Sequence, residues 1–259
     1  MKDRYGDVSL DLKHHIASAE IHRPPHNYFD YALIRDIADA FDALDAEPEC
    51  RAILLMAEGK SFCAGANFPA RATNPEPAPT THNPLYTEAV RLFGAKKPVV
   101  AAIQGPAIGG GLGLALVADF RVVAPEARFA ANFVKIGIHP GFGLTHTLPR
   151  LIGPQRAAIM MLTGRRVDGE TALAWGLADQ LTTLDKLREV AHALAAELAE
   201  NAPLAVQSTR ATLRKDLAAA VKAQTDLEFI EQRWLMTTED HREGVKAVAE
   251  RRPGNFKNK

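Results

Sequence analysis

The sequence has few cysteines, no excess of charge of either sign and no long apolar run. Its two cysteines, Cys50 and Cys63, give no disulfide framework and have no obvious metal-ligand neighbours, as expected in a reducing cytoplasm. The 31 basic and 31 acidic residues give a formal net charge of zero, which argues against nucleic acid or an anionic membrane as the main partner. No apolar run approaches the roughly 20 residues of a membrane span, and no basic-then-apolar leader opens the sequence. We therefore expect a compact cytoplasmic protein that binds no metal, no membrane and no nucleic acid.

Glycines are concentrated in one stretch, residues 96–119, around which we expect the rest of the chain to be organised. Pro98 precedes an apolar run rich in β-branched residues, 99–103, which is typical of a buried strand. Three consecutive glycines, 109–111, then lead into an apolar helix expected to reach Ala118. A strand that turns through glycines into a helix leaves backbone N–H groups to bind an oxyanion or a phosphate. Taken alone, the pattern is equally typical of a tight turn that requires small residues.

Residues 51–68 repeat this plan. They predict a buried strand over 52–57, a turn at 58–60 and a second small-residue segment that contains Cys63. Two such turns could each place one N–H on a single carbonyl oxygen, which would hold a thioester enolate without using a side chain. Cys63 itself is expected to be a small core residue rather than a nucleophile.

The remaining sequence alternates strands, turns and helices. We expect antiparallel strands over 7–12 and 15–21, and then a helix capped by Asp30 that runs to Asp45. A short helix should follow Asp168, which has the position of an N-cap. Beyond Leu184 the pattern predicts amphipathic helices over 185–200, 203–214, 216–238 and 240–251.

The segment between Phe68 and Pro84 is different in character. Its four prolines, with Pro84 at its end, exclude a regular helix or strand. It can be a flexible surface loop, a lid over a site, or both.

Four segments together resemble the enoyl-CoA hydratase/isomerase (crotonase) family, in that family's order and spacing. They are GKSFCAGANF, KKPVVAAIQGPAIGGGLGLALVAD, ARFAANFVKIGIHPGFGLTHTLPRLIG and MLTGRRVDGETALAWGLAD. The resemblance implies an α/β fold, a crotonase-like ββα spiral with a helical C-terminal region. It implies that residues 1–195 bind acyl-CoA and that residues 196–259 form a helical trimerisation region, giving a homotrimer or a hexamer built as a dimer of trimers. It also implies metabolism of fatty or aromatic acids, with coenzyme A as part of the substrate and no separate cofactor.

The resemblance assigns candidate residues to the thioester. By position, the backbone N–H groups of Ala66 and Gly110 would form the oxyanion hole. Arg23, after the second strand, and Ala64 would contact coenzyme A, although Arg23 could equally belong to a solvated turn. In the basic tail, Phe256 and Lys257 could reach the coenzyme A of a neighbouring subunit, or the tail could be disordered.

The carboxylates that hydratases of this family use are missing from the sequence. Adding water across a double bond needs an acid and a base near the α and β carbons. One glutamate position is Gly113 here, and the Pro-Glu pair is replaced by Asn132 and Phe133. The aspartate that some isomerases use is replaced by Gly141. Ordinary hydration with two glutamates is therefore not expected.

Other residues could complete the site. His139, two residues before Gly141, is a candidate base, since histidine is a competent base at neutral pH, but a core or subunit-contact role is the simpler alternative. Asn132 could orient water or substrate, and Tyr86 could face the pocket. Phe133 should keep the pocket apolar, which favours an aromatic or alicyclic acyl group.

Three functions remain open. The first is an acyl-CoA isomerase or lyase that acts through the enolate, with His139 or a residue of 69–88 moving the proton. The second is a hydrolase of the thioester or of a C–C bond, with water placed near His139 or Asn132. The third is a non-catalytic acyl-CoA-binding protein that has kept both turns.

Overall fold

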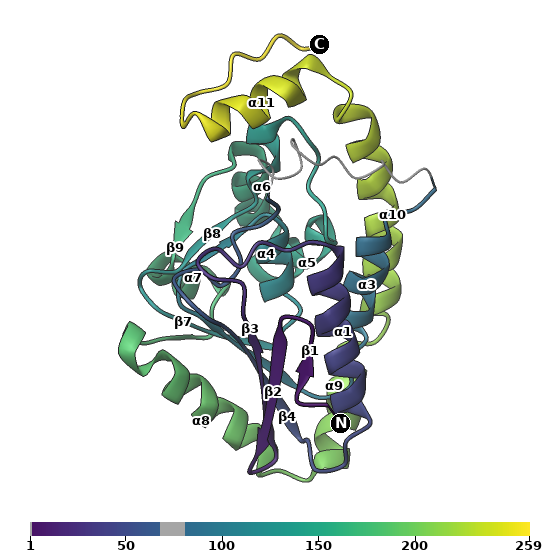
Figure 1. The fold of residues 1–259 in the computed structure, drawn as a ribbon, viewed down its shortest axis with the longest axis vertical. Helices are drawn as coiled ribbons and strands as arrows, with labels where there is room; N and C mark the ends of the chain where they lie inside the picture. The colour runs from purple at the N-terminus through teal and green to yellow at the C-terminus, as the bar shows by residue number, and fades with distance from the viewer. Residues whose placement is uncertain (1, 68–80) are drawn as a thin grey trace.

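The fold is built on a seven-stranded sheet with helices on both faces (Figure 1). The computed structural model describes residues 2–67 and 81–259, so the proline-rich segment, expected as a loop or lid, lies largely outside the described residues. The sheet has the order β1-β2-β3-β4-β5-β7-β10. These strands are Arg4–Tyr5, Val8–Lys13, Ile16–Ile21, Ala52–Ala57, Val99–Ile103, Phe120–Val123 and Gln180–Leu181.

The strand pairing follows the sequence pattern closely. β2 and β3 are antiparallel, as predicted, and the pairs from β3 through β4, β5 and β7 to β10 are parallel. A smaller sheet joins β6 (Pro106–Ile108), β8 (Arg128–Ala130) and β9 (Val167–Asp168). β8 pairs in parallel with β6, directly before the glycine turn.

Alternation along the buried strands separates two hydrophobic cores. In β4, Ile53 and Leu55 belong to the larger core, and Leu54 and Met56 to the smaller one. The larger core includes residues of α1 (Tyr31–Asp45), α3 (Pro84–Phe93), α4 (Gly110–Ala115), α5 (Leu144–Ile152), α6 (Pro154–Thr163) and α7 (Gly169–Trp175). The smaller core is closed by one helix, α8 (Leu187–Ala199), on the opposite face (Figure 1). β4 is apolar at every position because each of its two faces packs against a hydrophobic core.

Helix ends were predicted well where a side chain caps them. Asp30 Oδ1 accepts from the Leu33 N–H at 2.9 Å, and Asp168 Oδ1 accepts from the Thr171 N–H at 2.8 Å. The helix after the glycines is shorter than expected, because α4 ends at Ala115. The carbonyls that follow bind arginine side chains: Val117 O accepts from Arg214 at 3.2 Å and Ala118 O from Arg121 at 2.8 Å.

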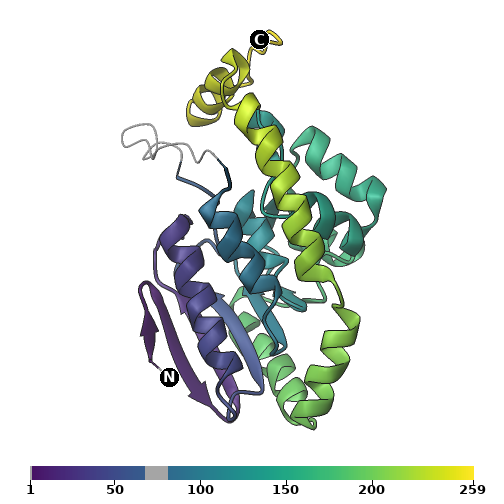
Figure 2. The ribbon, with the colours of Figure 1, turned by 90° about the vertical axis from the view of Figure 1, so that its right-hand side faces the viewer.

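Three helices complete the C-terminal region: α9 (Pro203–Leu213), α10 (Leu217–Leu235) and α11 (Glu239–Ala249). α10 runs alongside α3, as the side view also shows (Figure 2). The tail folds back on α11, and the Asp240 N–H donates to Lys259 O at 3.0 Å. The expected division after residue 195 falls inside α8, and its assignment to acyl-CoA binding and trimerisation stays a prediction.

Candidate functional site

The two small-residue turns lie side by side. Cys63 and Ala107 form a parallel bridge, in which the Cys63 N–H donates to Pro106 O and the Ile108 N–H to Cys63 O, both at 3.0 Å. A Cβ on Gly111 would lie 2.0 Å from Cys63 O, so only glycine allows this approach. Burial raises the pKa of the Cys63 thiol to about 12, which keeps it protonated and excludes a nucleophilic role.

Phe29 connects the two predicted oxyanion residues. Its N–H donates to Gly65 O at 3.1 Å, and it forms a parallel bridge with Ala66. Its ring lies against Gly110, where a Cβ would come within 2.2 Å of the ring. Ala66 and Gly110, 44 residues apart in the chain by their numbers, therefore contact the same aromatic residue.

Among the described residues, no protein acceptor is recorded for the N–H groups of Ala66 and Gly110. In the parallel bridge between Phe29 and Ala66, the Phe29 N–H donates to Gly65 O. In this pattern the Ala66 N–H points away from the paired strand and makes no bridge hydrogen bond. Gly110 is the first residue of α4, where backbone N–H groups have no partner within the helix. Their joint role as an oxyanion hole stays a prediction.

The space beside Gly113 is filled by an aromatic ring. A Cβ on Gly113 would lie 2.6 Å from Phe142 Cδ1. Phe142 is 1% exposed, has a left-handed backbone (φ +64°) and packs edge-on against Phe29, with ring centroids 6.1 Å apart. A hydrophobic side chain therefore occupies the position where a family glutamate would begin.

The space beside Gly141 is filled by a hydroxyl group. A Cβ on Gly141 would lie 2.0 Å from Tyr86 Oη and 2.6 Å from Gln232 Nε2. Tyr86 donates to Gln232 Oε1 at 2.8 Å, and Gln232 Nε2 donates to His139 O at 2.9 Å. Polar groups from α3 and α10 thus take the place of the missing aspartate.

Asn132 and Phe133 lie next to the glycine turn. They begin a 3₁₀ helix, η1 (Asn132–Ile136), directly after β8. A Cβ on Gly109 would be in ordinary contact with both, 3.6 Å from Phe133 Cζ and 3.7 Å from Asn132 Oδ1. The structure therefore brings these two predicted pocket residues together at the start of α4.

His139 has a defined tautomer. Its Nδ1 lies 2.8 Å from Pro140 O. A carbonyl oxygen only accepts, so Nδ1 carries the hydrogen and the neutral ring presents Nε2 as its basic atom. The side chain is partly buried, and its role as the base stays a prediction.

Glu228 of α10 is a site residue that the sequence did not reveal. Its side chain is fully buried and accepts from the Gly143 N–H at 2.7 Å, the Thr145 N–H at 3.0 Å and Thr145 Oγ1 at 2.5 Å. Burial raises the pKa of the Glu228 carboxyl, and these hydrogen bonds and nearby His139 oppose that shift. Glu228 caps α5, whose own N-cap residue is a glycine, and so fixes the turn that carries Phe142.

The sequence did not reveal Gln232 either, and one reason explains why both residues were missed. Glu228 and Gln232 lie on one face of α10, together with the buried Val221 and Thr225. Their helical spacing is visible in the sequence, but polar residues at those positions predict a solvated face. Only the fold shows that the face packs against loop 139–145.

The predicted coenzyme A residues Arg23 and Ala64 both make contacts within the chain. Arg23 pairs with Asp7 at 2.5 Å and with Asp30 at 2.9 Å, so its guanidinium already has carboxylate partners. The Ala64 N–H donates to His26 O at 2.9 Å, within the loop after Arg23. Contact with coenzyme A stays a prediction for both residues.

The C-terminal tail lies on α11. The Lys257 N–H donates to Asp240 at 2.6 Å, and the side chain of Phe256 is half-exposed. His241 Nδ1 lies 2.7 Å from Ile136 O, which joins α11 to the end of η1. The tail is therefore ordered, and the role of Phe256 and Lys257 in a neighbouring subunit stays a prediction.

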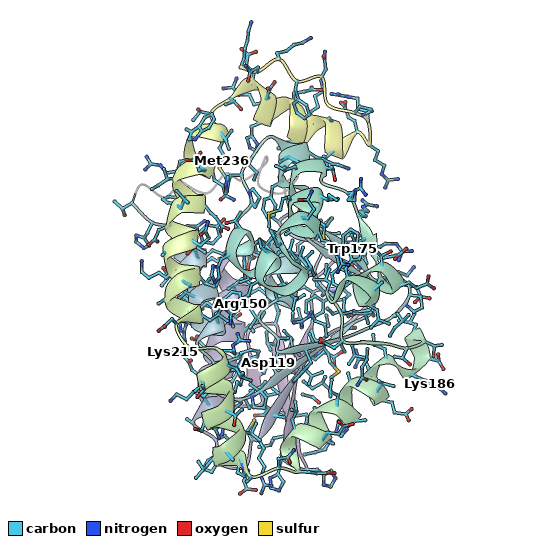
Figure 3. The ribbon with its side chains drawn as sticks, turned by 180° about the vertical axis from the view of Figure 1, so that it is seen from behind. Asp119, Arg150, Trp175, Lys186, Lys215 and Met236 are labelled. Carbon is cyan, nitrogen blue, oxygen red and sulfur yellow. The ribbon has the colours of Figure 1, made fainter. Side chains whose placement is uncertain are left out.

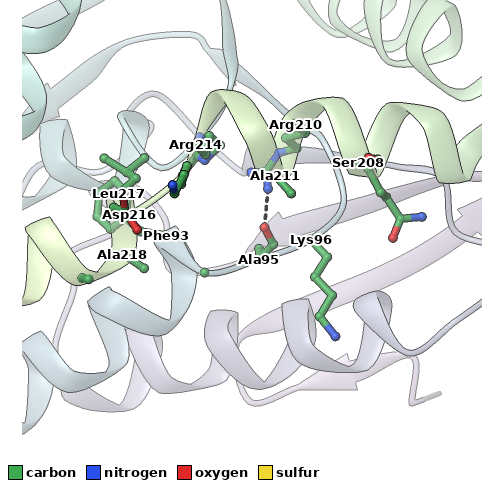
Figure 4. A pocket seen from close by; sticks show the side chains of 14 residues that line it. Phe93, Ala95, Lys96, Ser208, Arg210, Ala211, Arg214, Asp216, Leu217 and Ala218 are labelled. Atoms are coloured by element: carbon green, nitrogen blue, oxygen red, sulfur yellow. Dashed lines mark hydrogen bonds between the residues drawn. The ribbon is translucent and has the colours of Figure 1, made fainter.

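A cavity of about 570 Å³ lies away from this site, between the end of α3 and the α9–α10 junction (Figure 4). Its basic residues are Lys96, Arg210, Arg214 and Lys215. Arg210 and Arg214 both donate to Asp119, at 2.8 and 2.9 Å, and Arg210 also donates to Ala95 O. Asp119 and Lys215 lie on this side of the molecule (Figure 3). Arg210 and Arg214 thus bind groups near the amino end of β5. The glycine turn follows the carboxyl end of β5. We therefore assign the cavity no part in the candidate site.

Neither a metal site nor a membrane span is found in residues 2–67 and 81–259. No group of three or more histidine, cysteine or acidic side chains there could hold a metal ion. None of the helices described is long and apolar enough to cross a membrane.

Comparisons with known proteins agree on one family. The family model described as enoyl-CoA hydratase/isomerase matches residues 11–259. The (E)-benzylidenesuccinyl-CoA hydratase of Thauera aromatica is 32% identical over 96% of this chain and 98% of its own. The crotonyl-CoA hydratase of Syntrophomonas wolfei is 30% identical over 97% of this chain and 98% of its own. An enoyl-CoA hydratase/isomerase structure from Pseudoalteromonas atlantica is 27% identical, with a TM-score of 0.88 over 97% of this chain and 100% of that chain.

Proposed function

The chain belongs to the enoyl-CoA hydratase/isomerase family and has the crotonase fold, as the sequence predicted, and we propose that it is an isomerase or lyase rather than a standard two-glutamate hydratase. Members of this family are enzymes that act on coenzyme A thioesters. In the proposed reaction, the thioester oxygen binds the N–H groups of Ala66 and Gly110. Charge that develops on this oxygen in the enolate is then stabilised by donors that need no reorganisation.

The observation that carries this proposal is that neither hydratase glutamate position offers an acid or a base. Phe142 occupies the space beside Gly113, and Phe133 stands at the second glutamate position. The Tyr86 hydroxyl occupies the space beside Gly141, the aspartate position of some isomerases, so the proposed reaction needs a base from elsewhere. A phenyl ring cannot move a proton, and a phenol is a weak acid at neutral pH. Hydration has therefore lost its usual acid and base, while enolate formation keeps both backbone donors.

His139 is the proposed proton-transfer group. Its Nε2 is the basic atom, and the loop that carries it is held by Gln232 and is adjacent to the turn that Glu228 holds. Asn132 would orient the substrate beside the glycine turn. The other proposed source of a base, residues 69–88, is described only from residue 81 on.

The proposed acyl group is aromatic or alicyclic. Rings of Phe29, Phe133 and Phe142 surround the glycine turn and would give the acyl group apolar contacts. The name of the Thauera aromatica relative, with its benzylidene group, supports an aromatic acyl chain. Arg23, Ala64 and, from a neighbouring subunit, Phe256 and Lys257 would bind the coenzyme A.

The proposed assembly is a homotrimer, or a hexamer formed from two trimers, in the cytoplasm. α10 presents an apolar stripe to solvent: Leu227 is 50% exposed, Ile230 58% and Trp234 55%. Three large apolar side chains on one helix face are typical of a subunit contact. The two buried, unpaired cysteines support a reducing compartment.

The test is α-proton exchange. A saturated acyl-CoA is incubated with the protein in D₂O, and NMR follows deuterium at the α carbon while absorbance follows the enoyl group and a thiol reagent follows free coenzyme A. We expect exchange without thiol release and with little hydration of an enoyl-CoA. Thiol release would indicate the hydrolase, binding without exchange would indicate the non-catalytic protein, and rapid hydration would contradict the proposal directly.

A further inference from the structure

The cavity of about 570 Å³ at the α9–α10 junction has a lining with an excess of positive charge (Figure 4). Its lining contains one acidic side chain, Asp216, and four basic ones: Lys96, Arg210, Arg214 and Lys215. A cavity of this volume is within the usual range of pockets that bind small molecules. The lining therefore favours a negatively charged occupant.

Carboxylates outside the lining offset only part of this charge. Asp119 binds both arginines, at 2.8 and 2.9 Å, and Asp45 accepts from the Lys96 N–H at 2.8 Å. Arg150 adds a further positive charge from an adjoining cavity of about 180 Å³, which Arg214 also lines. Basic groups thus still outnumber acidic ones around the cavity.

Like charges are crowded at Arg214. Burial lowers the pKa of its guanidinium, and the charges of Arg210 and Arg121 lower that pKa further, whereas Asp119 has the opposite effect. A negatively charged ligand would relieve this repulsion.

The two arginines have hydrogen-bonding capacity that the protein does not use. Arg210, which is 8% exposed, donates to Asp119 and to Ala95 O, but no partner for its Nη2 is found within the described residues. Arg214 Nε is buried and also lacks a partner there. An unpaired buried donor costs free energy. Both side chains line the cavity, so a side-chain movement of the kind common on binding would bring these donors to a ligand oxygen.

The first turn of α10 lines the same cavity. The Leu217 N–H donates to Arg214 O at 3.0 Å, but among residues 2–67 and 81–259 no acceptor is found for the N–H groups of Ala218 and Ala219. The N-cap residue, Asp216, makes no side-chain hydrogen bond to the helix. Unpaired N–H groups at the positive end of a helix favour phosphate oxygens.

We propose that this cavity is a binding site for a small organic phosphate, whose phosphate group is bound by the first turn of α10, the two arginines and the two lysines. Donors on separate elements suit a tetrahedral phosphate better than a planar carboxylate, because its oxygens point in different directions. The organic part would lie against Phe93 and Leu217, which are buried in the lining. This site is independent of the proposed function, since the oxyanion residues follow the opposite end of β5.

The first experiment measures the Kd of phenyl phosphate by calorimetry at constant ionic strength, with uncharged benzyl alcohol as the control ligand. We expect saturable binding of phenyl phosphate only. Lys96→Gln combined with Lys215→Gln should weaken binding about tenfold, because two exposed charge contacts are lost. Lys186→Gln combined with Lys246→Gln removes the same charge elsewhere and should leave the Kd unchanged; Lys186 lies on the opposite side of the molecule from Lys215 (Figure 3).

The second experiment removes the acidic group of the lining. Asp216→Asn should tighten phenyl phosphate binding about threefold, since one repulsive charge is lost. Asn tolerates the left-handed backbone of this residue (φ +63°), so the turn is kept. Asp185→Asn, at an exposed position before α8, is the matched control and should not change the Kd.

A third measurement distinguishes an organic phosphate from the free ion. Inorganic phosphate should bind more weakly than phenyl phosphate, because it makes no apolar contacts. NMR titration with phenyl phosphate should shift the Ala218 and Ala219 amide signals and the Arg214 Nε–H signal.

Each outcome has a definite meaning. The inference is overturned if millimolar phenyl phosphate gives no saturable binding, if inorganic phosphate binds equally well, or if the cavity lysine variant keeps the wild-type Kd. The last result would place the phosphate elsewhere, for example at the proposed coenzyme A residues. None of these results bears on α-proton exchange, which tests the proposed function separately. Circular dichroism checks that each variant is folded.

Discussion

At the scale of single residues, the proposed site depends on two backbone N–H groups. The Ala66 and Gly110 N–H groups come from turns that contact Phe29 from different parts of the chain. Substituting Gly110 would test them poorly, because any Cβ there would meet the Phe29 ring at 2.2 Å. Ala66 already has a Cβ, so its N–H can be removed with less disturbance.

Ala66→Pro is expected to lower the rate of α-proton exchange by roughly 10²–10³, the usual effect of losing one oxyanion donor. Proline removes the N–H, and Gly65 before it tolerates the restricted backbone. The rate is measured by NMR at saturating acyl-CoA. Ala66→Gly keeps the N–H and should retain most of the rate; equal rates for both variants would remove Ala66 from the oxyanion hole.

His139→Ala is expected to lower the exchange rate by roughly 10²-fold, as for loss of a general base, and to leave the Kd for coenzyme A unchanged. The reason is that Nε2 is the basic atom of a ring held at Nδ1 by Pro140 O. His146→Ala, on α5, serves as the matched histidine control. Unaltered kinetics in His139→Ala would assign the base to another residue.

At the scale of elements, α10 buries polar residues beside apolar ones on its inner face and exposes large apolar residues on its outer face. Glu228 and Gln232 are buried against loop 139–145, and Ile230 and Trp234 are exposed. This arrangement is stable because every polar group named on the inner face has a hydrogen-bond partner. α10 therefore holds loop 139–145 through its inner face and leaves an apolar outer face exposed.

Sequence predicted some of these elements and missed others for physical reasons. Caps at Asp30 and Asp168 could be predicted, because a cap is a contact between residues three apart. The contact between Tyr86 and Gln232 spans 146 residues, and one sequence holds no signal for such a pair. The early end of α4 could not be predicted for the same reason. The Val117 carbonyl, just beyond the helix, accepts a hydrogen bond from Arg214, which is 97 residues away in the chain.

The C-terminal tail should detach from α11 in acid. Hydrogen bonds from Arg252 and from the Asn255 N–H lower the pKa of Glu243 from 4.5 to about 2. Because the pKa is lower when the tail is docked, the stabilisation is complete above pH 4.5 and is lost as the pH falls toward 2. Hydrogen exchange at the Asn255 N–H should accelerate between pH 5 and 3, after correction for intrinsic rates.

Glu243→Gln provides the control for this pH dependence. Its tail should exchange rapidly at neutral pH and show no further change over the same range, because the group that titrates is absent. If the wild-type tail stays equally protected down to pH 3, the Glu243 contacts do not hold it.

At the scale of the whole molecule, the exposed stripe of α10 predicts self-association. Ile230→Asp combined with Trp234→Asp should convert a trimer or hexamer to monomers, because two like charges would be buried without partners in the contact. Sedimentation velocity gives the molar mass. Leu204→Asp, at an 80% exposed position on α9, should leave the mass unchanged. A wild-type monomer at micromolar concentration would contradict the assembly.

The central claim is that two main-chain donors polarise one thioester carbonyl. Isotope-edited infrared difference spectroscopy measures this directly on an acyl-CoA labelled with ¹³C at that carbonyl. The account predicts that the carbonyl stretch shifts to lower wavenumber on binding and that part of the shift is lost in Ala66→Pro. A bound thioester whose carbonyl stretch is the same as in water, or is unaffected by Ala66→Pro, would contradict it.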